Sequence, residues 1–118
     1  MASQLEKIAA RIASIKAELA AIEEMRPGSL TRQYKDPEQQ SGAYYQLSYT
    51  RDGRSRTEYV PRDAVRVVKA QIANYKQFKA LTDEWVALGI EQSRLKVKEK
   101  AGQPHSRTRE DKGRTRHS

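Results

Sequence analysis

Apolar residues recur at helical spacing close to the start of the chain. From Leu5 onward they stand alternately three and four residues apart, which is the a/d pattern of a coiled coil. We therefore predict a helix over residues 3–25 that is ended by Pro27-Gly28. About three heptads are few for an isolated coiled coil, so this seam needs a partner within the fold or in a second chain. The dimer or partner seam consists of Leu5, Ile8, Ile12, Ile15, Leu19 and Ile22.

The middle of the chain, residues 27–60, has the pattern of a small antiparallel sheet. A short strand is expected around Leu30–Tyr34, followed by a polar loop with the sequence KDPEQQSG. A hairpin then turns at Asp52-Gly53, and two registers compete for it. A two-residue turn would set Leu47 opposite Glu58, whereas a three-residue turn with a bulge at Gly53 would set Leu47 opposite Thr57.

The second register separates apolar from polar residues more cleanly. A slip of one residue exchanges the two faces of a strand, so clean segregation favours the bulged hairpin, which we predict. Its apolar face would hold Tyr45, Leu47, Tyr49 and Tyr59, and we expect these tyrosines to be core. Its polar face would hold Gln46, Ser48 and Thr50 beside Arg54, Arg56 and Glu58.

Helical periodicity returns after Pro61 and predicts a long helix over residues 61–99. One apolar face, made by Val65, Val68, Ile72, Tyr75 and Phe78, is expected to cover the hairpin. The second half of this helix would then run antiparallel to the first helix, and a homodimer would complete a four-helix arrangement. Residues 100–118 show no periodicity and predict a disordered basic tail. The fold class is α+β: a heptad helix (residues 1–26), a strand plus hairpin, and a long helix.

Composition adds two constraints to this picture. Leu, Ile, Val and Phe make up only about a sixth of the 118 residues, which is little for a core and favours one small domain with a partner. There are 23 Lys and Arg against 15 Asp and Glu, a formal net charge of +8. Such a balance favours contact with nucleic acid or another anionic surface, although it also serves solubility.

The sequence offers no catalytic constellation. The chain lacks cysteine, its histidines, His105 and His117, lie in the basic tail, and its six glycines form no phosphate-binding loop. We therefore expect a non-enzyme without metal or cofactor. No apolar run suits a signal peptide or a membrane span, so a cytoplasmic protein without membrane contact is expected.

The basic residues around the predicted sheet are the candidate site. Arginine forks match phosphate oxygens and guanine edges, and a two- or three-stranded sheet fits a major groove. A solvated strand face is the alternative interpretation, and for the tyrosines base stacking is the alternative to core packing. The predicted nucleic-acid-binding residues are Arg32, Lys35, Arg51, Arg54, Arg56 and Arg62.

Three short motifs carry a family resemblance. The order RPGSL (26–30), GAYYQLSY (42–49) and TEYVP (57–61), followed by IANYKQFKAL (72–81), resembles a family of small bacterial domains of unknown function. The resemblance covers roughly residues 5–98. It implies a role around mobile DNA, because such domains are often encoded near or within transposase-type genes. Relatives carry a cysteine cluster where this chain reads KDPEQQS, so no metal function is carried over.

The leading hypothesis is a dimeric, non-enzymatic accessory protein that binds nucleic acid, with DNA favoured over RNA. In this hypothesis the hairpin arginines dock on the nucleic acid and the coiled-coil stem spaces two heads. The rival hypothesis is a structural adaptor whose stem binds a protein partner, such as a recombinase or transposase. A third hypothesis is RNA binding through the tail and the tyrosines.

Overall fold

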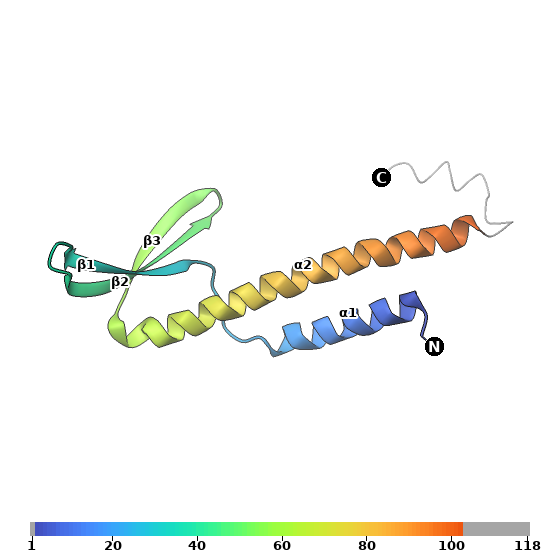
Figure 1. Cartoon of the computed structure of the whole chain (residues 1–118), viewed down its shortest axis with the longest axis horizontal. Coiled ribbons are helices and arrows are strands. Elements are labelled where there is room, and N and C mark those ends of the chain that lie inside the picture. Colours follow the sequence, from blue (N-terminus) through green and yellow to red (C-terminus); the bar gives the residue numbers. More distant parts are fainter. Residues whose placement is uncertain (1, 103–118) are drawn as a thin grey trace. The chain divides into compact units, whose positions relative to one another are not determined.

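The computed structural model describes residues 2–102, and its elements follow the predicted order (Figure 1). Helix α1 is followed by a three-stranded antiparallel sheet with the strand order β1-β2-β3. A short 3-10 helix, η1, then leads into the long helix α2. The bounds are α1 Gln4–Ala21, β1 Ser29–Asp36, β2 Ser41–Arg51, β3 Arg54–Val60, η1 Arg62–Ala64 and α2 Val65–Ala101. The predicted α+β class is confirmed, and the predicted tail lies mostly outside the described residues.

Helix α1 begins with a capping box. The Ser3 N–H donates to Glu6 Oε1 at 2.9 Å, and the Glu6 N–H donates to Ser3 Oγ at 3.1 Å. This reciprocal pair satisfies two amide groups that have no partner within the helix. The middle of the predicted seam packs against other residues of the same chain, since Ile8, Ile12 and Ile15 are all buried.

The predicted end of α1 at Pro27-Gly28 is wrong, because the helix stops at Ala21. The segment that follows is held by side chains and backbone of α2 instead of continuing the helix. Asn74 Nδ2 donates to the carbonyl oxygen of Glu24 at 2.7 Å, and the Arg26 N–H donates to the carbonyl oxygen of Gln71 at 3.1 Å. These long-range bonds replace the helical bonds that residues 22–26 would otherwise make.

The chain divides into two compact units. Among the described residues, the first contains residues 2–16 and 83–102, in which α1 packs against the second half of α2. Arg11 bonds Glu84, and Gln4 bonds Glu91, so the partner number falls as the number in α1 rises. The two helical segments are therefore antiparallel, as predicted (Figure 1).

The second unit, residues 17–82, contains the sheet and the first half of α2. Its core is formed by Leu47 and Val60 of the sheet together with Val68 and Ile72 of α2. Tyr45 and Tyr49 pack against this cluster, as expected for two of the three hairpin tyrosines. The predicted cover of the hairpin by the first half of the long helix is thus confirmed.

The hairpin has the register of a two-residue turn, not the bulged register that we predicted. Arg51 pairs with Arg54, and Leu47 pairs with Glu58, so only Asp52 and Gly53 form the turn. Both turn residues have positive φ, 55° and 75°, which is the type I′ conformation that matches the twist of a two-residue hairpin. The bulged hairpin is therefore wrong, and Thr57 does not face Leu47.

The turn between β1 and β2 is also tighter than the predicted polar loop. Strand β1 extends to Asp36 and β2 begins at Ser41, so the connection is the turn Pro37–Gln40. Asp36 Oδ1 accepts the Gln39 N–H at 3.3 Å, as a carboxylate commonly does at a turn. The two hairpins together make β1 and β3 the edge strands of the sheet.

Gly28 is a position where the fold demands glycine. Its φ is 139°, and a Cβ atom there would lie 2.7 Å from Leu47 Cδ1 and 3.0 Å from the Ser48 carbonyl oxygen. We expect Gly28→Ala to lower the free energy of unfolding by at least about 2 kcal/mol, through backbone strain and overpacking of the core.

Gly89→Ala is the matched control for this prediction. Gly89 lies inside α2, and a Cβ atom there would meet nothing within 4 Å. This variant is expected to gain about 0.5–1 kcal/mol from helix propensity. Urea unfolding followed by circular dichroism measures both changes, and equal stabilities of the two variants would contradict the Gly28 contacts.

Candidate nucleic-acid interface

Four of the six predicted basic residues share one face of the sheet, which is the face packed against α2. Arg32 stands opposite Tyr45, Arg56 opposite Tyr49, and Arg51 opposite Arg54. Because residues opposite each other in a ladder point to the same side, these arginines lie on the side of Leu47. Lys35 has the other parity along β1 and lies on the opposite face.

The expected grouping of Arg54 and Arg56 with the polar residues of β2 is therefore wrong. It followed from the bulged register, and the two-residue turn moves every β3 side chain to the other face. The residues opposite Gln46, Ser48 and Thr50 are Tyr59, Thr57 and Ser55.

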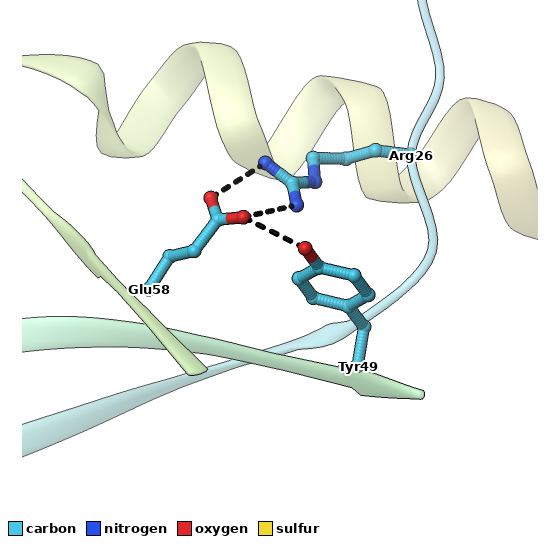
Figure 2. Close-up of polar contacts among 3 residues, drawn as sticks. All are labelled: Arg26, Tyr49 and Glu58. Carbon is cyan, nitrogen blue, oxygen red and sulfur yellow. Dashed lines mark hydrogen bonds and ion pairs between the residues drawn. The ribbon is translucent and has the colours of Figure 1, made fainter. Parts of the chain in front are cut away.

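The same register puts Glu58 on the side of the core, where Arg26 neutralises it. Two guanidinium nitrogens of Arg26 donate to the two carboxylate oxygens of Glu58 at 3.1 and 3.2 Å. Tyr49 Oη donates to Glu58 Oε2 at 2.9 Å, and the Arg26 guanidinium carbon lies 4.9 Å from the centre of the Tyr49 ring. Figure 2 shows the three side chains closing into one cluster from three different segments.

This cluster changes the protonation equilibria of both charged groups. Hydrogen bonds from Arg26, and then from Tyr49, hold the pKa of the Glu58 carboxyl below its ordinary value of 4.5. The hydrogen bond to Glu58 raises the pKa of Arg26, against the opposing effect of burial. Glu58 therefore stays ionised and paired, and it does not offset the arginines that share its face.

A groove of about 330 Å³ opens where β3 passes into α2. Tyr45 and Val65 supply its apolar part, while Arg62, Arg66 and Lys69 supply three cationic side chains. All three cations are exposed. The 3-10 turn places Arg62 one helical turn ahead of Arg66, so both reach the same side of the helix start.

A second groove of about 380 Å³ lies between the start of β1 and α2. It is lined by residues 28–30 on the strand side and by Lys69, Ile72, Ala73 and Lys76 on the helix side. Lys69 lines both grooves, so they adjoin at this residue of α2. Arg32 follows Leu30 by two residues on the same face of β1. We call this surface the basic groove: Arg32, Arg62, Arg66, Lys69 and Lys76.

The cations of the basic groove are not neutralised by neighbouring carboxylates. Within residues 2–102 none of the five forms an ion pair, and neither Asp nor Glu lines either part of the groove. Arg32 lies over the ring of Tyr34, with its guanidinium carbon 5.7 Å from the ring centre. Fixed positive charge therefore accumulates along an edge strand and a helix.

The sequence contained a signal for the two lysines that were not predicted. Arg62, Arg66, Lys69 and Lys76 recur at intervals of four, three and seven residues, which is a helical stripe beside the apolar one. The predicted binding residues centred on the sheet and included only Arg62 of this stripe.

The arginines at the hairpin tip form a smaller basic group. Arg51 and Arg54 face each other across the type I′ turn, and Arg56 follows on the same side; all three are exposed. Like charges directly opposite in a ladder repel, so a bound anion would relieve this pair. Two of these three residues, Arg51 and Arg54, have no apolar neighbour opposite them in the ladder.

Other classes of site have little support among the described residues. No three His, Asp or Glu side chains in residues 2–102 come together as metal ligands. Within the same range neither α1 nor α2 has an apolar stretch long enough to cross a membrane.

The elements above define an α+β chain with a basic groove between an edge strand and a long helix. The chain belongs to the family described as "Domain of unknown function (DUF6788)", which matches residues 2–70. The match spans α1, the whole sheet and the first turns of α2, including Arg32, Arg62, Arg66 and Lys69. The expected membership in a family of unknown function is thus confirmed. No curated protein and no solved structure matches the chain.

The Glu58 ion pair predicts a pH-dependent stability. Because the pKa of Glu58 is lower in the folded state, the pair stabilises the protein fully above about pH 4.5 and less as pH falls through the folded-state pKa. We expect Glu58→Gln to be less stable than the parent at pH 7, with a difference that shrinks on acidification. Thermal unfolding between pH 7 and pH 3 measures it.

Glu38→Gln provides the control for the change of charge. Glu38 lies exposed in the turn between β1 and β2, outside any cluster of this kind. Its substitution should leave the pH profile of the parent unchanged. An unaltered profile for Glu58→Gln as well would contradict the ion pair and, with it, the two-residue register.

Proposed function

We propose that the protein is a non-enzymatic accessory protein that binds nucleic acid, with DNA favoured, through the basic groove. One observation carries this proposal: four cationic side chains, Arg62, Arg66, Lys69 and Lys76, line the two grooves, and within residues 2–102 no carboxylate pairs them. Guanidinium forks fit phosphate oxygens in a bidentate manner, and lysines add flexible point charges. A polyanion supplies the missing counter-charge at several points at once.

The shape of the basic groove suits a chain of phosphates better than a single anion. The cations of η1 and α2 extend from Arg62 to Lys76, which is about 20 Å along a helix axis at ~1.5 Å per residue. Tyr45 and Val65 between them offer apolar surface of the kind that sugar rings contact. Successive cations on one line would bind successive phosphates and release their counterions.

The hairpin tip would add peripheral contacts to the same ligand. Arg51, Arg54 and Arg56 lie on the face of the sheet that also carries Arg32. Lys35, on the other face, has no part in this contact. A cytoplasmic location and a link to mobile DNA, both expected from the sequence, remain parts of the proposal.

The proposed homodimer needs a surface other than the buried seam. Ile8, Ile12 and Ile15 are between 0% and 7% exposed, so they have little area left for a second copy. Val86, Ile90 and Val97 of α2 are 50–63% exposed and recur at helical spacing. We assign the contact between two copies to this stripe.

A structural adaptor is the second candidate function, and the same stripe of Val86, Ile90 and Val97 favours it. In this alternative a protein partner of recombinase or transposase type covers the stripe, and the cationic surface serves solubility. A stoichiometric protein recovered from nuclease-treated lysate, and lost with Ile90→Glu, would favour the adaptor. Recovery that depends on intact nucleic acid would favour the basic groove.

The direct test of the groove is the salt dependence of DNA binding. Each phosphate contact on duplex DNA contributes about 0.9 to the slope of log K against log salt. We expect Arg62→Gln combined with Arg66→Gln to lower that slope by about 1.8, measured by fluorescence anisotropy with labelled random duplex.

The control removes two cations elsewhere on α2. Arg94→Gln combined with Lys96→Gln changes the net charge equally, and both residues belong to the other compact unit. Its slope should stay close to that of the parent. If both double variants lose affinity equally, binding reflects net charge alone and the groove is not the site.

A further inference from the structure

The face of the sheet that points away from α2 has an unusual composition for so basic a chain. Every second residue of 29–33, 44–50 and 55–59 lies on it, and each is Ser, Thr, Gln or Tyr. Lys35 of β1 lies at one end of this face and carries a charge. We call this surface the neutral face; it carries hydroxyl, amide and aromatic groups.

Two tyrosines give the neutral face its main feature. The ring centres of Tyr44 and Tyr59 are 6.5 Å apart, with an angle of 37° between the ring planes. Tyr59 is 67% exposed, although the sequence predicted it as core. The two-residue turn explains the difference, because it pairs Tyr59 with Gln46 and turns it away from Leu47.

Amide side chains stand beside both rings. Gln46 is directly opposite Tyr59, and Gln33 is directly opposite Tyr44. Glutamine presents a donor and an acceptor together and so can form two hydrogen bonds with the edge of a base. Within residues 2–102 neither amide bonds a residue across the sheet, and Gln33 Nε2 donates to Thr31 Oγ1 on its own strand at 3.3 Å.

We propose that Tyr44 and Tyr59 stack unpaired nucleobases, so the preferred ligand of this protein is single-stranded nucleic acid. This inference rests on the proposed nucleic-acid binding and specifies its substrate class. Aromatic rings bind every base through its π-face, whereas the bases of a duplex are already stacked on one another. The residues opposite the rings, Gln33 and Gln46, are uncharged, which fits bases better than phosphates.

The position of the rings connects them to the basic groove. Tyr45 and Val60 form the last pair between β2 and β3, so Tyr44 and Tyr59 flank the end where the chain turns into η1. Arg62 follows Tyr59 by three residues. A strand with its phosphates on Arg62 and Arg66 therefore needs only to pass around this end of β3 to place bases on the rings.

The test compares three labelled probes of equal length by fluorescence anisotropy. They are a single strand of about 12 nucleotides, an abasic strand that keeps only sugars and phosphates, and the corresponding duplex. We expect the parent protein to bind the base-containing strand about tenfold more tightly than the abasic one, as one stacked base provides. Tyr44→Ala combined with Tyr59→Ala should abolish this preference and leave the abasic affinity unchanged.

Three further variants separate stacking from folding. Tyr59→Phe keeps the ring and should keep the preference, whereas Thr57→Ala on the same face should change nothing. Tyr59→Ala alone, at an exposed position, should lower the preference without a change in the thermal unfolding curve, which covers the case in which the double variant fails to fold.

The outcomes distinguish this inference from the function on which it rests. Equal affinity of the parent for abasic and base-containing strands, with duplex still bound, would overturn the stacking and leave the basic groove standing. Loss of affinity for both strands in Tyr59→Ala would also overturn it. Failure to bind any probe at low salt would overturn both proposals.

Discussion

The ion pair between Arg26 and Glu58, closed by the Tyr49 hydroxyl, is the constraint on which the arrangement of the sheet depends. Glu58 lies opposite Leu47, so its carboxylate points to the side where the core forms. A carboxylate beside apolar groups needs a partner, and a bidentate guanidinium is a strong one. Arg26 also bonds the Gln71 carbonyl through its backbone. Arg26 thus connects the segment after α1 to the edge strand β3 and to α2.

This register decides which chemistry each face of the sheet presents. With Glu58 held by Arg26, the basic residues of the sheet's helix side are Arg32, Arg51, Arg54 and Arg56, while Asp36 lies at the end of β1. The other side receives Tyr59, Thr57 and Ser55, and becomes neutral. In the proposed function, the groups that would bind phosphates and the groups that would stack bases lie on opposite faces of one sheet. The same three-residue cluster accounts for both surfaces of the proposed site.

Much of the fold could be predicted because its signals are local or periodic. The heptad spacing of Ile8, Ile12 and Ile15 predicted a packed helix, and Val68 and Ile72 predicted the core face of α2. The hairpin register could not be predicted from segregation of apolar residues, since the group that compensates Glu58 is Arg26, which is 32 positions away. The prediction of where α1 ends was wrong for the same reason. Gln71 and Asn74, about 50 positions further along the chain, donate hydrogen bonds to Glu24. The helix therefore ends before the stop signal at Pro27-Gly28 is reached. The prediction that Tyr59 is core was wrong for the same reason, because it assumed the bulged register.

The most direct measurement is a titration of ¹⁵N-labelled protein with a short single-stranded oligonucleotide, followed by amide chemical shifts. The account predicts that the largest shifts cluster at Arg32, Tyr59, Arg62, Arg66 and Lys69, with small changes in residues 4–16 and 83–101. No shifts at low salt, or shifts confined to those two helical segments, would contradict it. Shifts confined to the helical segments would place the nucleic-acid site there, whereas no shifts would favour a protein partner on the exposed stripe of α2.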